Sequence, residues 1–297
     1  MNLQTYLSST PPNLAKAILA FAEAVKRIDG KIRTAETGEA GSQNTFGEEQ
    51  LKLDVLADRI VFEELKKSGV VAIAASEEQS DEIELSKEGE FSAAFDPLDG
   101  SSLVDVNLAV GTIFGIWEGK GFIGKSGKEM RAAGYAIYGP RTTFTIAIDS
   151  NPVEFTLQTD GDWKLTIEKM EIGEGKMFAP GNLRACAENK EYLTLLDFWA
   201  ENGYQLRYSG GMVPDVHQIL VKGKGVFSYP GSESNPAKLR LIYECAPLAY
   251  VIEKAGGASS DLEKSILAKK VEFLDQRTVV CLGSKDEVDR FDKFLTI

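Results

Sequence analysis

Hydrophobic residues recur every three or four positions in several segments of the chain, which is the spacing of an amphipathic helix. This spacing predicts a helix at Leu14–Arg27 and a second at about Glu48–Lys67. The segment between them, Ile32–Thr45, is rich in glycine, serine and threonine and is predicted to form a loop. Later helices are predicted at Lys190–Glu201, Pro214–Val221, Leu239–Ala255, with a kink at Pro247, and Asp286–Leu295.

Short apolar runs between these segments predict β-strands. Val70–Ala75 and Phe91–Phe95 have the pattern of buried strands, and acidic residues follow each of them directly. The sequence Thr-Asp-Gly-Asp at 159–162 separates two further runs and is a hairpin signal. The remaining predicted strands are Thr112–Trp117, Ala133–Tyr138, Thr142–Ile148, Val153–Leu157, Trp163–Ile167, Gln205–Tyr208, Gly225–Tyr229 and Thr278–Leu282.

The order of the predicted elements changes near residue 170. Strands dominate before that point, whereas helices and strands alternate from about Gly173 onward. No internal repeat or low-complexity tract interrupts the chain. We therefore expect two domains, residues 1–172 and 173–297.

The composition is that of a soluble globular protein, with 43% hydrophobic and 26% charged residues. No apolar run approaches the roughly 18 residues that a membrane span needs, and Met1–Pro12 lacks the pattern of a secretory signal. The three cysteines, Cys186, Cys245 and Cys281, form no CxxC pair and suit a reducing compartment. We therefore expect a cytoplasmic protein.

The formal net charge of −12 argues against nucleic acid and anionic membranes as partners, because both are polyanions. An anionic small substrate is still compatible with this charge, since divalent cations can lie between carboxylates and a phosphate. If the substrate is anionic, the charge therefore predicts a metal site.

Both predicted buried strands end in carboxylates. Glu77 and Glu78 follow the first strand, and the string DPLDGSS, residues 96–102, follows the second. Two adjacent strand ends that bring carboxylates to one edge would hold hard divalent cations, which prefer oxygen ligands. Without a cation, this many neighbouring carboxylates would repel one another.

The string DPLDGSS combines two kinds of ligand. Pro97 favours a turn, and Gly100 permits close backbone approach. The backbone N–H groups after Gly100, at Ser101 and Ser102, can cradle a phosphate. A structural turn would explain a lone Asp-Gly-Ser, but the whole string directly after an apolar strand, with an acidic pair upstream, favours a functional site.

Asp54 and Asp58 are four positions apart on the predicted second helix and therefore share one face. For these two acids alone, a solvated helix face and a place beside the metal site both remain open. The only histidine, His217, lies on a predicted helix away from the acidic segments, so we expect a structural or surface role for it.

These segments together resemble the lithium-sensitive, metal-dependent sugar phosphatases, and among them the fructose-1,6-bisphosphatase and sedoheptulose-1,7-bisphosphatase branch. The resemblance covers nearly the whole chain from Phe46 onward and includes FGEEQLKLDVLADRIVFEEL, FDPLDGSSLVDVNLAVGTIFGIW, GEGKMFAPGNLRA and LRYSGGMVPDVHQI. It implies a layered α-β-α-β-α fold of the α+β class, with mixed sheets between helix layers and two intimately packed subdomains. The N-terminal domain would bind metal and phosphate, and the C-terminal domain the sugar and the distal phosphate.

Matched motif by motif, the resemblance implies a metal site. Glu244 lies on an apolar predicted helix, where an unpaired carboxylate would be costly and a metal would provide a partner. The implied ion is Mg²⁺, with Mn²⁺ also possible. The implied metal ligands are Glu77, Glu78, Asp96, Leu98 through its carbonyl, Asp99 and Glu244, and the implied catalytic residues are Asp54, Glu78 and Asp99.

The resemblance also implies two phosphate subsites. Gly100, Ser101, Ser102 and Arg240 would contact the reacting phosphate, and Gly210 and Met212 would line the sugar. The family's counterpart of Arg207 comes from a neighbouring subunit, which implies a homo-oligomer, either a dimer or a tetramer. The residues implied at the distal phosphate are Asn182, Arg207, Tyr208, Tyr229 and Lys238.

The implied activity is Mg²⁺-dependent hydrolysis of the 1-phosphate of sedoheptulose 1,7-bisphosphate, which gives sedoheptulose 7-phosphate and phosphate. Glu78 or Asp54 would orient or deprotonate the attacking water, while Arg240 and the Ser101 and Ser102 amides stabilise charge on phosphorus. Fructose-1,6-bisphosphatase activity or dual specificity is the alternative among enzymes. A non-catalytic metal- and phosphate-binding homologue is the alternative from another class, and the intact acidic set argues against it.

Overall fold

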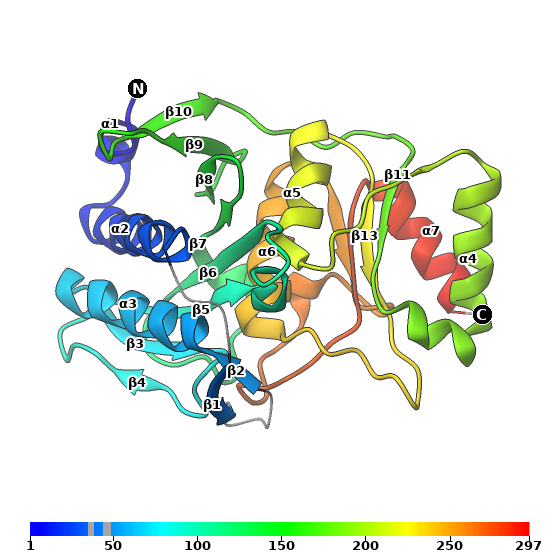
Figure 1. Cartoon of the computed structure of the whole chain (residues 1–297), viewed down its shortest axis with the longest axis horizontal. Coiled ribbons are helices and arrows are strands. Elements are labelled where there is room, and N and C mark those ends of the chain that lie inside the picture. The colour runs from blue at the N-terminus through cyan, green and yellow to red at the C-terminus, as the bar shows by residue number, and fades with distance from the viewer. Residues whose placement is uncertain (35–38, 44–48, 297) are drawn as a thin grey trace.

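The computed structural model describes residues 1–34, 39–43 and 49–296, and for 39–43 and 49–51 the course of the backbone alone. Figure 1 shows five layers in which helices and sheets alternate, so the predicted α-β-α-β-α architecture of the α+β class is confirmed. The helices are α1 (Leu3–Tyr6), α2 (Pro12–Ile32), α3 (Lys52–Ser68), α4 (Lys190–Glu201), α5 (Met212–Lys222), α6 (Ala246–Lys254) and α7 (Lys285–Leu295).

The first sheet has eight strands in the order β10-β9-β8-β7-β6-β5-β3-β4, antiparallel except for the neighbours β3 and β5. Its central strands are apolar on both faces because α2 and α3 cover one face and α5 and α6 the other. On the first face Phe21 of α2 stacks on Phe114 at 4.2 Å between ring centroids. The strands are β3 (Val71–Ser76), β4 (Ile83–Glu84), β5 (Phe91–Asp99), β6 (Val110–Glu118), β7 (Met130–Tyr138), β8 (Thr142–Ala147), β9 (Val153–Leu157) and β10 (Trp163–Ile167).

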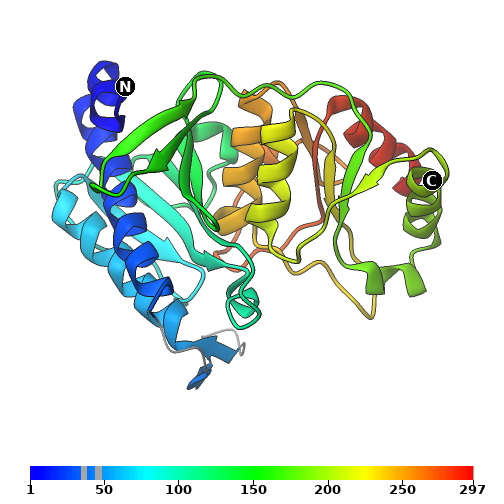
Figure 2. The same cartoon turned by 45° about the horizontal axis from the view of Figure 1, so that its top comes forward.

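The second sheet has five strands in the order β12-β11-β13-β15-β14. The helices α4 and α7 cover its outer face, where Trp199 packs on Phe178 and Phe291 is fully buried. Figure 2 shows α5 and α6 side by side between the two sheets, so both sheets border the same central layer. The strands are β11 (Met177–Pro180), β12 (Gln205–Leu206), β13 (Val226–Tyr229), β14 (Ala258–Ser260) and β15 (Val280–Gly283).

The structure departs from the prediction at several element boundaries. The second helix begins at Lys52 and not at Glu48, which lies outside the described residues, and β2 (Glu49–Leu51) precedes it. The predicted loop Ile32–Thr45 contains β1 (Glu39–Gln43), which pairs with β2. The predicted long helix around Pro247 instead opens with a π-helical turn, η5 (Leu241–Cys245), because Pro247 lacks the N–H that a continuous α-helix needs there.

The predicted hairpin around residues 159–162 is confirmed, since β9 and β10 pair antiparallel. Among the described residues, no helix is both long and apolar enough to span a membrane.

Candidate active site

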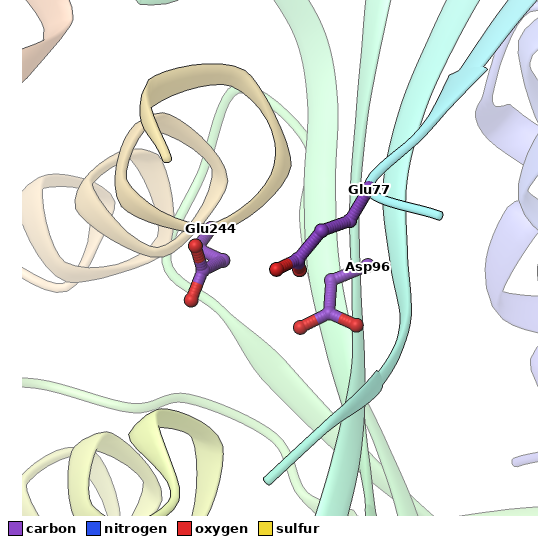
Figure 3. A group of neighbouring side chains, drawn as sticks. All are labelled: Glu77, Asp96 and Glu244. Carbon is purple, nitrogen blue, oxygen red and sulfur yellow. The ribbon is translucent and has the colours of Figure 1, made fainter. Parts of the chain in front are cut away.

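Three carboxylates meet between the first sheet and the central helices. Ser76 of β3 pairs in parallel register with Phe95 of β5, so the next residues, Glu77 and Asp96, lie side by side. Glu244 of η5 faces them, and ligand oxygens of the three side chains all lie within 4.8 Å of one another (Figure 3). The expected meeting of two acidic strand ends is therefore present, with a third carboxylate from the C-terminal domain.

The DPLD segment is part of β5 and does not follow it, so the predicted strand end at Phe95 is wrong. Asp96 pairs with Ile113 and Asp99 with Gly111, so two residues of β5 oppose the single residue Thr112 of β6. This bulge accommodates Pro97, whose carbonyl accepts a hydrogen bond from the Thr112 hydroxyl at 2.8 Å. The bulge replaces the turn expected at Pro97.

Gly100 and the two serines follow the strand as expected. Gly100 has a φ of +74°, a left-handed conformation, and a Cβ there would lie 3.2 Å from the Cα of Gly211. Ser101 then begins the short 3₁₀ helix η2 (Ser101–Leu103). This close approach brings the start of η2 against the C-terminal domain.

Asp99 connects β5 to α5. Its Oδ1 accepts the N–H of Met212 at 3.2 Å and its Oδ2 accepts the N–H of Val213 at 2.7 Å. Asp99 therefore caps the N-terminus of α5, where a carboxylate is favoured by the free amides and the helix dipole. Burial raises the pKa of Asp99 to about 6, although these hydrogen bonds act in the opposite direction.

Arg240 lies against the carboxylates. Its guanidinium pairs with Glu77 and, at 2.7 Å, with Asp275, and its backbone N–H donates to Glu244 at 2.6 Å. The side chain is only 3% exposed, so these ionic contacts are shielded from water. The contacts place Arg240 beside the acids that are expected to hold the metal ion and, through it, the reacting phosphate.

The acidic group fits a divalent cation. Burial, together with the repulsion of Glu77 and other nearby acids, raises the pKa of Asp96 and of Glu244 well above the ordinary value. Such clustering destabilises the charged forms, and a bound cation would remove that cost. All three side chains offer oxygen, the donor that Mg²⁺ and Mn²⁺ prefer.

The other predicted acids are not among the three clustered carboxylates. Asp54 and Asp58 are 4% and 5% exposed, so the alternative of a solvated helix face is wrong. Asp58 accepts a hydrogen bond from the Gln79 side chain at 2.8 Å, which ties α3 to the segment after β3. Glu78 is half-buried and donates its N–H to the Ser76 hydroxyl, and Leu98 is buried in the β5 bulge.

A second cavity, of about 570 Å³, lies in the C-terminal domain. Its lining includes Asn182, Tyr208, Tyr229 and Lys238, four of the five residues expected at the distal phosphate. Burial raises the pKa of Tyr229, and the charge of nearby Glu244 adds to that shift. Tyr229 therefore lines this cavity and lies within electrostatic range of Glu244.

The fifth residue, Arg207, does not line this cavity in its own chain. It is exposed and its Nη1 donates to the carbonyl of Leu206. Gly210, with a φ of +105°, and the buried Met212 lie in the segment that leads into α5. The position of Arg207 is compatible with a role on a neighbouring subunit.

Three polar residues at these sites were missed by the sequence analysis. Arg184 lines the second cavity, Asp275 pairs with Arg240, and the buried Asp215 accepts the N–H of Ser209 at 2.7 Å. Asp215, three residues into the helix that follows the GGM segment, is a common first-turn acid and could have been noted from the sequence. For Asp275 no local sequence pattern exists, because its partner is 35 residues away.

His217 lies in the interface of α5 with the first sheet, as expected for a structural residue. Its Nδ1 is 3.1 Å from the Tyr135 hydroxyl, and its Nε2 is 3.7 Å from the buried Glu154 carboxylate. Burial lowers the pKa of His217 to about 4, so the imidazole is neutral at physiological pH.

Comparison with known protein families agrees with this geometry. The sequence profile "Fructose-1-6-bisphosphatase, N-terminal domain" matches residues 2–168, and the profile "Fructose-1-6-bisphosphatase, C-terminal domain" matches residues 172–296. The chain belongs to the fructose-1,6-bisphosphatase family. This membership confirms the predicted class of phosphoric monoester hydrolase in a metal-dependent family.

Within the fructose-1,6-bisphosphatase family the chain is similar to members with two different names. It is 48% identical to the chloroplastic sedoheptulose-1,7-bisphosphatase of Triticum aestivum over 99% of this chain and 76% of that protein. It is 45% identical to a class 1 fructose-1,6-bisphosphatase of Trichlorobacter lovleyi over 95% and 90%, respectively. The holo crystal structure of Leishmania major fructose-1,6-bisphosphatase superposes with a TM-score of 0.93 at 31% identity, over 100% of this chain and 99% of that chain.

Proposed function

We propose that this chain hydrolyses the 1-phosphate of sedoheptulose 1,7-bisphosphate in a Mg²⁺-dependent reaction, with fructose 1,6-bisphosphate as a second substrate. Membership of a family of sugar bisphosphatases supports the reaction class. The similarity to the Triticum aestivum enzyme supports the seven-carbon sugar, and the similarity to the bacterial enzymes supports the second substrate.

One observation carries the proposal: the chain has both a three-carboxylate group and a separate cavity lined by hydroxyl and cationic groups. Glu77, Asp96 and Glu244 form the first part, and Tyr229 of the second part lies within electrostatic range of Glu244. A phosphatase acting on monophosphates would need only the first part. The second part gives the protein a way to select substrates that carry another phosphate.

The cation is proposed to bind Glu77, Asp96 and Glu244, with Glu78, Asp99 and the Leu98 carbonyl as further ligands. When bound, it would supply Lewis-acid activation and neutralise charge on the scissile phosphate. The chain itself would act through Glu78 or Asp54, which would orient the attacking water and accept its proton. The Ser101 and Ser102 amides and Arg240 would stabilise the phosphate oxygens as the P–O bond breaks.

The distal phosphate is proposed to bind Tyr208, Tyr229 and Lys238, with Asn182 shaping the wall and Gly210 and Met212 beside the sugar. A homo-oligomer, dimer or tetramer, would let Arg207 reach the cavity of a neighbouring subunit. We also propose that residues 1–172 bind the metal and the reacting phosphate, and that residues 173–297 bind the sugar and the distal phosphate. The proposed location is the cytoplasm.

The proposed metal dependence is tested by phosphate release from either bisphosphate with and without divalent cation. Activity should need added Mg²⁺ or Mn²⁺ and fall to background in excess chelator, because three clustered carboxylates cannot bind a phosphate dianion unaided. Restoring Mg²⁺ to the chelated enzyme is the control for irreversible damage. Full turnover in excess chelator would contradict the proposal.

A further inference from the structure

The distal cavity contains a cation that the resemblance does not assign. We infer that Arg184 binds the distal phosphate of the substrate and sets the preference of the enzyme for bisphosphates over monophosphates. This inference rests on the proposed function and names a specificity residue for the same site.

Two polar side chains of the cavity are used by the protein itself. The Asn182 amide nitrogen donates to the carbonyls of Pro230 at 2.8 Å and Asn235 at 3.0 Å. The Ser234 hydroxyl donates to Glu188, and the Ser234 N–H donates to the same carboxylate at 3.0 Å. These contacts hold the segment 230–235 against η4 (Leu183–Ala187) and leave neither group free to donate to a phosphate.

Glu188 is the acid nearest to this wall, and it is already engaged. Hydrogen bonds from Ser234 and its neighbours lower the pKa of Glu188 to about 2. The carboxylate is therefore directed at the loop, and no acidic residue is among those that line the cavity. An anion entering the cavity meets hydroxyl and cationic groups.

Besides the Asn235 side-chain amide, the groups still able to contact a ligand are the hydroxyls of Tyr208 and Tyr229 and the cations of Lys238 and Arg184. Arg184 is exposed on η4, and in the described part of the chain no hydrogen bond or ion pair engages its guanidinium. Burial raises the pKa of Tyr229, and the positive charge of Arg184 acts in the opposite direction. The guanidinium therefore lies within electrostatic range of the Tyr229 hydroxyl.

The chemistry of the two cations differs. A guanidinium offers a planar fork of N–H donors that matches two phosphate oxygens, whereas an ammonium such as that of Lys238 acts as a point charge. A phosphate dianion is held best when both are present. Arg184 therefore adds bidentate recognition to a cavity whose other assigned cation in this chain is Lys238.

The test compares Arg184→Ala with wild type on two substrates that differ only in the distal phosphate, fructose 1,6-bisphosphate and fructose 1-phosphate. Loss of a charge-assisted contact should raise KM for the bisphosphate about 10- to 100-fold and change kcat less than about twofold. For the monophosphate, kcat/KM should change less than about twofold, because the lost contact has no partner there. Arg184→Lys should restore part of the bisphosphate affinity.

Arg131→Ala is the matched control, since it also removes one surface arginine, which pairs with Glu118 and does not line this cavity. It should leave both substrates unaffected. An equal loss of kcat/KM on both substrates in Arg184→Ala would show a merely structural role. An unchanged KM for the bisphosphate would show that Arg184 does not contact the distal phosphate. Either result overturns the inference. If wild-type enzyme hydrolyses no bisphosphate, the proposed function fails, and the inference fails with it.

Discussion

The Asp99 carboxylate accepts two backbone N–H groups at the start of α5 and shares an acidic edge with Asp96 and Glu244. One side chain therefore contacts both the proposed metal site and the segment that leads from the sugar wall into α5. Arg240 has a similar double position, since it pairs with Glu77 and with Asp275. At the scale of single residues, the site depends on two charged side chains, those of Asp99 and Arg240, that each connect segments far apart in the chain.

Asp99→Asn should lower kcat by about 10²–10⁴, because one proposed metal ligand and one negative charge are lost at the reacting phosphate. The amide oxygen can still accept one N–H from α5, so circular dichroism and the melting temperature should stay close to those of wild type. Asp105→Asn, an exposed acid a few residues further along, is the control and should leave turnover unchanged.

Arg207→Ala should behave differently from Asp99→Asn. Because Arg207 is exposed and proposed to contact the distal phosphate across a subunit interface, its loss should raise KM about tenfold and leave kcat within about twofold. Steady-state kinetics of the two variants side by side gives the comparison. If both showed the same purely catalytic defect, the separation of the site into two phosphate subsites would be wrong.

At the scale of elements, α5 and η5 bring the C-terminal domain to the acidic edge. The first turn of α5 meets Asp99, and the same helix places His217 against Tyr135 of β7 and near Glu154 of β9. The orientation of α5 is thus fixed at two points along its length. A change at the second point should alter stability without touching the carboxylates.

His217→Gln should flatten the pH dependence of stability between about pH 6.5 and pH 4. The pKa of His217 is lowered to about 4, so in this window the unfolded chain binds a proton that the native imidazole does not. Wild type should therefore lose up to about 3 kcal/mol of unfolding free energy from this group on acidification. Urea titrations at several pH values measure it, and an equally steep slope in the variant would refute the assignment.

Much of the fold could be predicted from periodicity, and the exceptions have physical causes. The helix Lys190–Glu201 was predicted with its observed bounds, because its apolar stripe is clear and Asn189 caps it. The strands β11 and β14 were missed because each is only three or four residues long and is defined by its neighbours in the sheet.

The candidate site, like the fold, could be predicted from the sequence only in part. Glu77 and Asp96 could be placed together from two acidic strand ends, since parallel neighbours finish at one edge. Glu244 was assigned as a metal ligand only through the family resemblance, because a lone acid on an apolar helix carries no local signal. The hydrogen bonds of Asp99 to α5 were not predictable, because its partners lie more than 100 positions later in the chain.

At the scale of the whole molecule, the two sheets share a central layer of α5 and α6 (Figures 1 and 2). The three carboxylates lie where η5, at the start of α6, faces the first sheet (Figure 3). The second cavity is lined by residues between 182 and 238, and its Tyr229 lies within electrostatic range of Glu244. A substrate with phosphates at both ends would contact both domains at once. This arrangement supports the proposal of a bisphosphate substrate over a substrate with a single phosphate group.

The most direct test of this account is kcat/KM for phosphate release from purified enzyme in Mg²⁺, measured in parallel on sedoheptulose 1,7-bisphosphate, fructose 1,6-bisphosphate and the matched 1-phosphates. We expect both bisphosphates to be hydrolysed, sedoheptulose 1,7-bisphosphate with the higher kcat/KM, and each 1-phosphate at least about tenfold less efficiently, as loss of one charge-assisted phosphate contact predicts. Equal efficiency on the bisphosphates and the 1-phosphates, or no hydrolysis of either bisphosphate, would contradict it.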